Sequence, residues 1–174
     1  TLKSKHTFLL PDELEKLEIL ELTGKKTKYQ HSLEAFLFCC YTGLRYSDFT
    51  QLSEKNIVFI ENRPWINFTT IKTGAEVRLP LALLFEGKAW ELLRKHKKHL
   101  DEFFRIKANS TVNKDLIRIG KLAGIQKHFS FHSARHTNAT LLIYKGVNIT
   151  TVQKLLGHRN VSTTQIYSEV MATT

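Results

Sequence analysis

The sequence lacks a disulfide framework, a long apolar run and a secretory signal. Cys39 and Cys40 are its two cysteines, and adjacent residues do not readily bridge each other, so a disulfide scaffold is excluded. No apolar stretch approaches the roughly 20 residues that a membrane-spanning helix needs, and no signal peptide opens the chain. We therefore expect a soluble cytoplasmic protein in which both thiols are free and buried.

Acidic residues are few relative to basic ones. The chain has 16 Asp and Glu against 26 Lys and Arg, a net charge of +10. This excess favours a polyanionic partner, most commonly nucleic acid, although a basic protein without such a role stays an alternative. With 174 residues, 42% of them hydrophobic, one domain with its own core is expected. Because the chain starts with Thr1, we interpret it as part of a longer protein.

Most of the chain shows helical patterns. Pro11 and the acidic residues after it predict a helix start. The apolar segment HSLEAFLFCCYTG (31–43) predicts a central buried helix that ends at Gly43. Further helices are expected at 46–52, near 87–99, 111–123, 133–145 and 149–156, and around Tyr167, with Ser110 and Ser162 as N-caps and Gly146 as a C-cap.

Residues 57–81 show a different pattern. NIVFI, PWINFTT and EVRLPL are rich in β-branched and aromatic residues, and TGAE between the last two segments is a turn signal. We therefore predict a mainly α-helical protein with one small antiparallel sheet of three strands. The basic run RKHKKH (94–99) either contacts a DNA backbone or forms a solvated helix face.

Several side chains suit phosphate chemistry. Arg45 follows the buried helix, where it either pairs with Asp48 or serves as half of a bidentate phosphate clamp that Asp48 orients. Lys72, at a hairpin tip, either aids solubility or donates a proton to an oxyanion. His132 and Arg135 are three residues apart and share a helix face.

Two other features of this region have a more ordinary interpretation. His132 and His136 have the spacing of a zinc-binding helix, but no third ligand is evident. His132 alone would be read as a core or capping histidine. The tyrosine in LLGHRNVSTTQIYSEV, Tyr167, would alone be read as a packing residue nine positions after His158.

Together these signals form an ordered set: TGLR, the hairpin K-T-G, H-x-x-R-H, L-G-H and then Tyr167. The set resembles the catalytic domain of the tyrosine recombinases, or integrases, over about residues 8 to 170. The segment LEAFLFCCYTGLRYSDFTQL (33–52) is particularly similar to integrases of bacterial conjugative transposons and related mobile elements.

The resemblance implies how a scissile phosphate would be held. Arg45 and Arg135 would bind its non-bridging oxygens, and His158 would donate a hydrogen bond to it. Asp48 matches the acidic position that supports the first arginine. Fixed guanidinium groups suit this task, because attack on a phosphodiester builds negative charge on those oxygens.

The resemblance also implies the remaining chemistry. Tyr167 would attack the phosphorus, Lys72 would act as the general acid toward the departing 5′-hydroxyl, and His132 would assist proton transfer with the nucleophile. The covalent intermediate conserves the bond energy, so no cofactor is expected. No metal is expected either, because the chain shows no P-loop motif and no obvious acidic pair for magnesium.

We accordingly expect a site-specific recombinase that integrates or excises a mobile element. Its partners would be double-stranded DNA at attachment sites and further copies of itself in a tetramer, near the nucleoid of a bacterial cytoplasm. Residues 1–174 would be the C-terminal catalytic domain, without the N-terminal DNA-binding domain of the family. Only seven residues follow Tyr167, where many relatives have a longer tail. A type IB topoisomerase and a catalytically silent DNA-binding module are the alternatives.

Overall fold

The computed structural model describes residues 7–156. In its first half the elements are α1 (Pro11–Glu18), η1 (Gly24–Tyr29), α2 (Gln30–Thr42), α3 (Tyr46–Gln51), η2 (Glu54–Asn56), β1 (Ile57–Ile60) and β2 (Arg63–Thr69). In its second half they are β3 (Glu76–Pro80), η3 (Leu84–Gly87), α4 (Lys88–Lys95), α5 (Leu100–Phe104), α6 (Asn109–Ala123), α7 (Ser133–Tyr144) and α8 (Ile149–Leu156).

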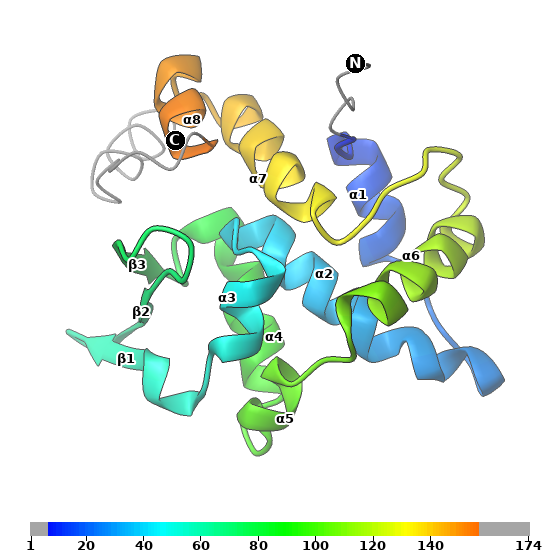
Figure 1. Ribbon diagram of the computed structural model, residues 1–174, viewed down its shortest axis with the longest axis horizontal. Coiled ribbons are helices and arrows are strands. Elements are labelled where there is room, and N and C mark those ends of the chain that lie inside the picture. The colour runs from blue at the N-terminus through cyan, green and yellow to red at the C-terminus, as the bar shows by residue number, and fades with distance from the viewer. Residues whose placement is uncertain (1–6, 157–174) are drawn as a thin grey trace.

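The predicted fold class, mainly helical with a three-stranded antiparallel sheet, is confirmed. The strands pair in the order β1-β2-β3, and Ile66 of β2 lies opposite both Ile57 and Leu79. Ile66 is fully buried, so one face of the sheet packs against the protein. Figure 1 shows the sheet at one side of the helical body, with α1 and α6 at the other.

Helix α2 runs through the centre of the molecule, as its apolar sequence predicts (Figure 1). Around it lies a cluster of aromatic rings that are at most 1% exposed: Phe36, Phe38, Phe49, Phe104 and Phe131. Cys39 and Cys40 are both free and buried there, as expected. Burial raises the pKa of both thiols, which keeps them protonated and unreactive at neutral pH.

Gly43 ends α2 as predicted, and its backbone explains why glycine stands there. Its φ is +77°, and its N–H donates to the carbonyl of Cys39 at 2.8 Å. A Cβ at this position would lie 2.7 Å from Oδ1 of Asn138 in α7. The Asn138 amide in turn donates to the carbonyl of Cys40 at 2.9 Å. Gly43 thus lets α7 approach the end of α2 closely.

One predicted helix is interrupted in the structure. The helix expected near 87–99 ends at Lys95, and α5 begins only at Leu100. The chain turns there because His96 contacts the buried carboxylate of Glu34 and stacks on Phe103, with ring centroids 4.7 Å apart. Lys95 also binds Glu34, at 3.0 Å. Part of the basic run therefore holds the fold together, which sequence alone does not indicate.

The predicted caps have mixed outcomes. Ser110 is not an N-cap, because α6 begins two residues before the expected start and Ala108 occupies the cap position. Gly146, with a φ of +92°, lies one residue beyond the C-cap Lys145 of α7. The short helix η1 was not predicted. Ser162 and the helix expected around Tyr167 lie outside the described residues.

Candidate active site

Arg45 lies in the turn between α2 and α3, two residues after Gly43. It is the N-cap residue of α3, and its side chain is only 14% exposed. Its Nη1 lies 3.7 Å from Oδ2 of Asp48, a separation longer than a hydrogen bond. The two side chains therefore form an ion pair whose atoms are separated by more than a hydrogen-bond distance.

Asp48 is nearly fully buried and contacts the start of the β2–β3 hairpin. Its two carboxylate oxygens lie 3.0 and 3.1 Å from the hydroxyl of Thr70, and Oδ1 also accepts the N–H of Ile71 at 3.1 Å. The Thr70 hydroxyl is itself 3.5 Å from Nη1 of Arg45. Asp48 therefore binds the first arginine and the hairpin into one polar cluster.

Thr70 is a site residue that the sequence analysis missed. A signal for it exists in the strand pattern, because Ile66, Phe68 and Thr70 follow one another at the two-residue spacing of a single strand face. Ile66 is fully buried and Thr70 is 6% exposed. A polar residue that continues a buried apolar face requires a hydrogen-bonding partner, and this requirement points to a nearby polar site.

Lys72 lies in the hairpin turn, where the sequence predicts it. The turn closes on Thr70, whose N–H donates to the carbonyl of Ala75 and whose carbonyl accepts the N–H of Gly74, both at 2.9 Å. Lys72 is exposed. The hairpin is therefore anchored at its base by Asp48 and extends a lysine into solvent at its tip.

His132 and Arg135 lie at the start of α7, as predicted. The adjacent Phe131 is 1% exposed, and its N–H donates to Oδ1 of Asn113 in α6 at 2.8 Å. This contact fixes the chain where the helix begins. His132 is the N-cap residue and is exposed, whereas Arg135 is half-buried.

The two arginines come close together at the end of α2. Nη1 of Arg135 donates to the carbonyl of Gly43 at 2.8 Å. Burial and, to a smaller extent, the positive charge of Arg45 together lower the pKa of Arg135 to about 10, against the opposing effect of Asp48. Arg135 is still charged at neutral pH. The site therefore combines two guanidinium groups with one buried carboxylate, an excess of positive charge suited to a phosphate.

His132 and His136 form a pair on the first turn of α7. Their Nε2 atoms are 3.3 Å apart, and their rings meet edge to face with centroids 5.0 Å apart. One ring donates and the other accepts, so the contact is lost when both are protonated.

Among residues 7–156, no three His, Cys, Asp or Glu side chains are grouped as a metal site. Nor is any helix in that range long and apolar enough to cross a membrane.

His158 and Tyr167, the other two predicted catalytic residues, lie outside the described residues. Within the described part, the structure brings Arg45, Asp48 and Arg135 together around Gly43 and joins the Lys72 hairpin to them through Thr70.

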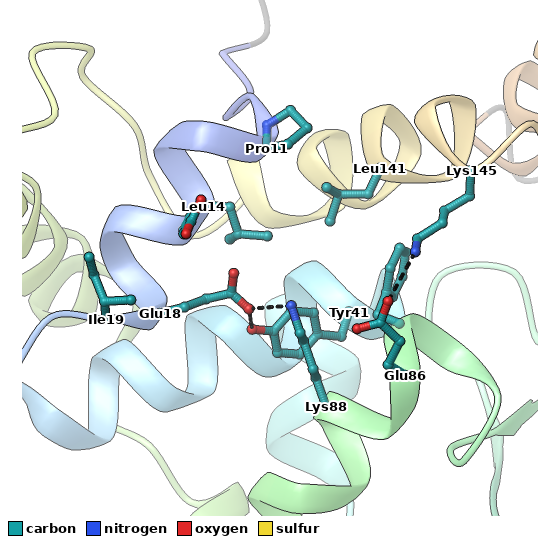
Figure 2. A pocket seen from close by; sticks show the side chains of 11 residues that line it. Pro11, Leu14, Glu18, Ile19, Tyr41, Glu86, Lys88, Leu141 and Lys145 are labelled. Carbon is teal, nitrogen blue, oxygen red and sulfur yellow. Dashed lines mark hydrogen bonds and ion pairs between the residues drawn. The ribbon is translucent and has the colours of Figure 1, made fainter.

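A pocket of about 500 Å³ lies elsewhere, among α1, α2, η3, α4 and α7 (Figure 2). Glu18 is at its centre and binds both the Tyr41 hydroxyl and, at 2.9 Å, Nζ of Lys88. None of the predicted site residues lines this pocket. Two ion pairs, Glu18 with Lys88 and Glu86 with Lys145, cross this pocket and hold its helices together.

Comparison with known proteins identifies the group to which the chain belongs. The sequence pattern of the phage integrase family matches residues 7–173. The chain belongs to this family. A tyrosine recombinase of Pseudothermotoga lettingae is 34% identical over 168 residues, which are 94% of this chain and 56% of the relative. Tyrosine recombinase XerA of Saccharolobus solfataricus is 37% identical over 133 residues, 75% of this chain and 43% of that protein.

Solved structures agree with this phage integrase family assignment. XerA recombinase matches with a TM-score of 0.63 at 25% identity, over 92% of this chain and 59% of that one. A lambda integrase dimer bound to a COC′ core site matches with a TM-score of 0.65 at 23% identity, over 92% of this chain and 60% of that one. The predicted catalytic-domain fold of the tyrosine recombinases is confirmed. The chain spans about half the length of the curated relatives it matches, and the resemblance to conjugative-transposon integrases stays a prediction.

Proposed function

We propose that the chain is the C-terminal catalytic domain of a site-specific DNA recombinase that cleaves and rejoins strands through a 3′-phosphotyrosyl intermediate. The observation that carries this proposal is the approach of Arg45 and Arg135 around Gly43. Holding two guanidinium groups together has a repulsive cost, and a bound phosphate offsets it. Membership of the phage integrase family supports the same activity.

In this proposal the two arginines bind the non-bridging oxygens of the scissile phosphate. Asp48 orients Arg45 through their attraction across 3.7 Å, and Arg135 leaves the cluster with an excess of positive charge. His158 donates a further hydrogen bond to the phosphate. These groups stabilise the pentacoordinate transition state more than the ground state, because negative charge on the oxygens increases as the nucleophile attacks.

The covalent step involves one bond made and one broken. The Tyr167 oxygen forms a bond to phosphorus, and His132 assists removal of the phenolic proton. The bond from phosphorus to the 5′-oxygen breaks, and Lys72 gives that oxygen a proton. The exposed position of Lys72 at a hairpin tip supports this role, because the side chain can reach a DNA strand lying over the site.

The same proposal covers the partners of the protein. A solved lambda integrase structure holds a tetramer bound to a Holliday junction, and we extend that assembly to this protein on its own double-stranded attachment sites. The net charge of +10 supports a DNA partner. Action on a mobile element, beside the bacterial nucleoid, belongs to the proposal as well.

A covalent-trapping experiment tests the proposed function. The full-length protein is incubated with a nicked suicide duplex that carries its attachment site, and a protein–DNA adduct is sought on a denaturing gel. We expect an adduct that disappears in Tyr167→Phe. An adduct that persists in this variant would overturn the assignment of the nucleophile.

The same assay separates the alternatives. DNA binding without an adduct at any site would instead indicate a silent binding module. Relaxation of supercoiled plasmids without regard to sequence would indicate a topoisomerase.

A further inference from the structure

The hydroxyl of Thr70 lies between two groups that belong to different parts of the site. It is within 3.1 Å of both oxygens of Asp48 and 3.5 Å from Nη1 of Arg45. A threonine hydroxyl has one proton to give and lone pairs to accept with, whereas a carboxylate only accepts and a guanidinium only donates. The proton of Thr70 therefore goes to Asp48, and its lone pair receives the N–H of Arg45.

The backbone of Thr70 belongs to the hairpin that carries Lys72. Its N–H and its carbonyl both pair across the base of the turn, with Ala75 and Gly74. The next residue, Ile71, donates its N–H to Oδ1 of Asp48. A shift of the Thr70 backbone therefore changes both the contact of its hydroxyl with Arg45 and the position from which Lys72 extends.

We propose that Thr70 is a positioning residue that couples Arg45 to the Lys72 hairpin. The inference rests on the proposed function, because it assigns Arg45 to the phosphate and Lys72 to the leaving group. Asp48 is 3% exposed and Thr70 6%, so water does not readily replace a lost hydroxyl. Removal of the hydroxyl leaves a buried carboxylate with one donor fewer, and the carboxylate then draws Arg45 or the hairpin out of place.

Three substitutions test the coupling. Thr70→Val removes the hydroxyl at nearly constant volume, Thr70→Ser retains it, and Thr69→Val makes the same change at the exposed neighbouring residue. In single-turnover cleavage by the full-length protein, we expect Thr70→Val to be about 10- to 100-fold slower, the loss that a displacement near 1 Å produces. Thr70→Ser should restore most of the rate that Thr70→Val loses, and Thr69→Val should cleave as the wild type does.

A second substrate distinguishes positioning from simple loss of structure. Replacing the 5′-bridging oxygen of the scissile phosphate by sulfur gives a leaving group that needs no proton, so the contribution of Lys72 is no longer required. Lys72→Ala should recover on this substrate, and Arg45→Ala should not. We expect Thr70→Val to recover in part, because one of its two misplaced groups has become dispensable.

The outcomes are distinct. Wild-type speed in Thr70→Val would overturn the inference, as would a defect in that variant that sulfur does not relieve at all. If Thr70→Val does not fold, as judged by thermal unfolding, Thr70→Cys takes its place, since a thiol is a weaker donor of similar size. Absence of any adduct with the wild-type protein would count against the proposed function instead.

Discussion

Two clusters in this protein have the same chemical parts and different geometries. In each, a carboxylate accepts a hydrogen bond from a hydroxyl and lies near a cation: Asp48 with Thr70 and Arg45, and Glu18 with Tyr41 and Lys88. Lys88 contacts Glu18 at 2.9 Å, whereas Arg45 stays 3.7 Å from Asp48. In addition, Arg135 brings a second positive charge to the Asp48 cluster.

We interpret the difference as one between a proposed anion-binding site and a cluster that holds helices together. The Glu18 cluster neutralises its charges at close range and links α1, α2 and α4 (Figure 2). The Asp48 cluster keeps an excess of positive charge, and the pKa of Arg135 is lowered first by burial and then by the charge of Arg45. An anionic ligand would offset the repulsion between the two arginines, which is present where binding is proposed.

The largest expected effect comes from removing the excess charge. Arg135→Ala should slow cleavage by about 10²- to 10³-fold, the loss typical of one transition-state donor, while DNA binding falls far less. Single-turnover cleavage and a binding titration measure the two quantities. Lys88→Ala, in the other cluster, is the matched control and should leave cleavage unchanged. An equal loss of cleavage and binding in Arg135→Ala would mean that Arg135 positions DNA instead.

The next effect concerns the glycine on which the Asp48 cluster is built. Gly43→Ala should lower the free energy of unfolding by about 2–4 kcal/mol, from the left-handed backbone and from contact with Asn138. Gly124→Ala is a close control, because Gly124 also ends a helix at positive φ but has no atom within 4 Å of its added Cβ. Chemical denaturation should show the smaller loss for Gly124→Ala; equal losses would mean that the approach of α7 does not require glycine.

A smaller effect is expected from the structural cluster. Glu18→Gln should reduce the free energy of unfolding by about 1–2 kcal/mol, since it weakens hydrogen bonds that involve a charged group. Cleavage by the folded protein should be unchanged. Thermal unfolding and the trapping assay measure the two properties, and Tyr41→Phe should give a similar or smaller loss of stability. Impaired cleavage in folded Glu18→Gln would show that the two clusters are not independent.

The smallest effect is stabilisation by a simple anion. Sulfate mimics a phosphate, and its binding between Arg45 and Arg135 would return the pKa of Arg135 toward its ordinary value. At a sulfate concentration three times its dissociation constant, one bound ion raises the free energy of unfolding by about 0.8 kcal/mol. Sulfate should raise the Tm of the wild-type protein more than it raises the Tm of Arg135→Ala. The variant, measured in the same sulfate series, corrects for the general effect of the salt. Identical increases in both proteins would remove the evidence for a preformed anion site.

Local patterns in the sequence predicted much of the fold and the site. The apolar run predicted α2 and the β-branched segments predicted the sheet. The catalytic roles of Arg45, Lys72, His132 and Arg135 came from the resemblance and stay predictions. The break between α4 and α5 was not predictable, because it depends on Glu34, which lies 62 residues before His96. The strand pattern marks Thr70 as a buried polar residue, but its partner Asp48 lies 22 residues earlier in the chain, and local patterns do not identify that partner.

Gly43 has a further consequence for the mechanical tolerance of the site. Arg45 follows it by two residues, and Arg135 binds its carbonyl oxygen, so one peptide is the common reference for both guanidinium groups. A rigid shift of α2 carries both charges in the same direction, and the spacing between them changes little. A small shift of α2 should therefore move the proposed phosphate site as a whole and leave the spacing of its two guanidinium groups nearly unchanged.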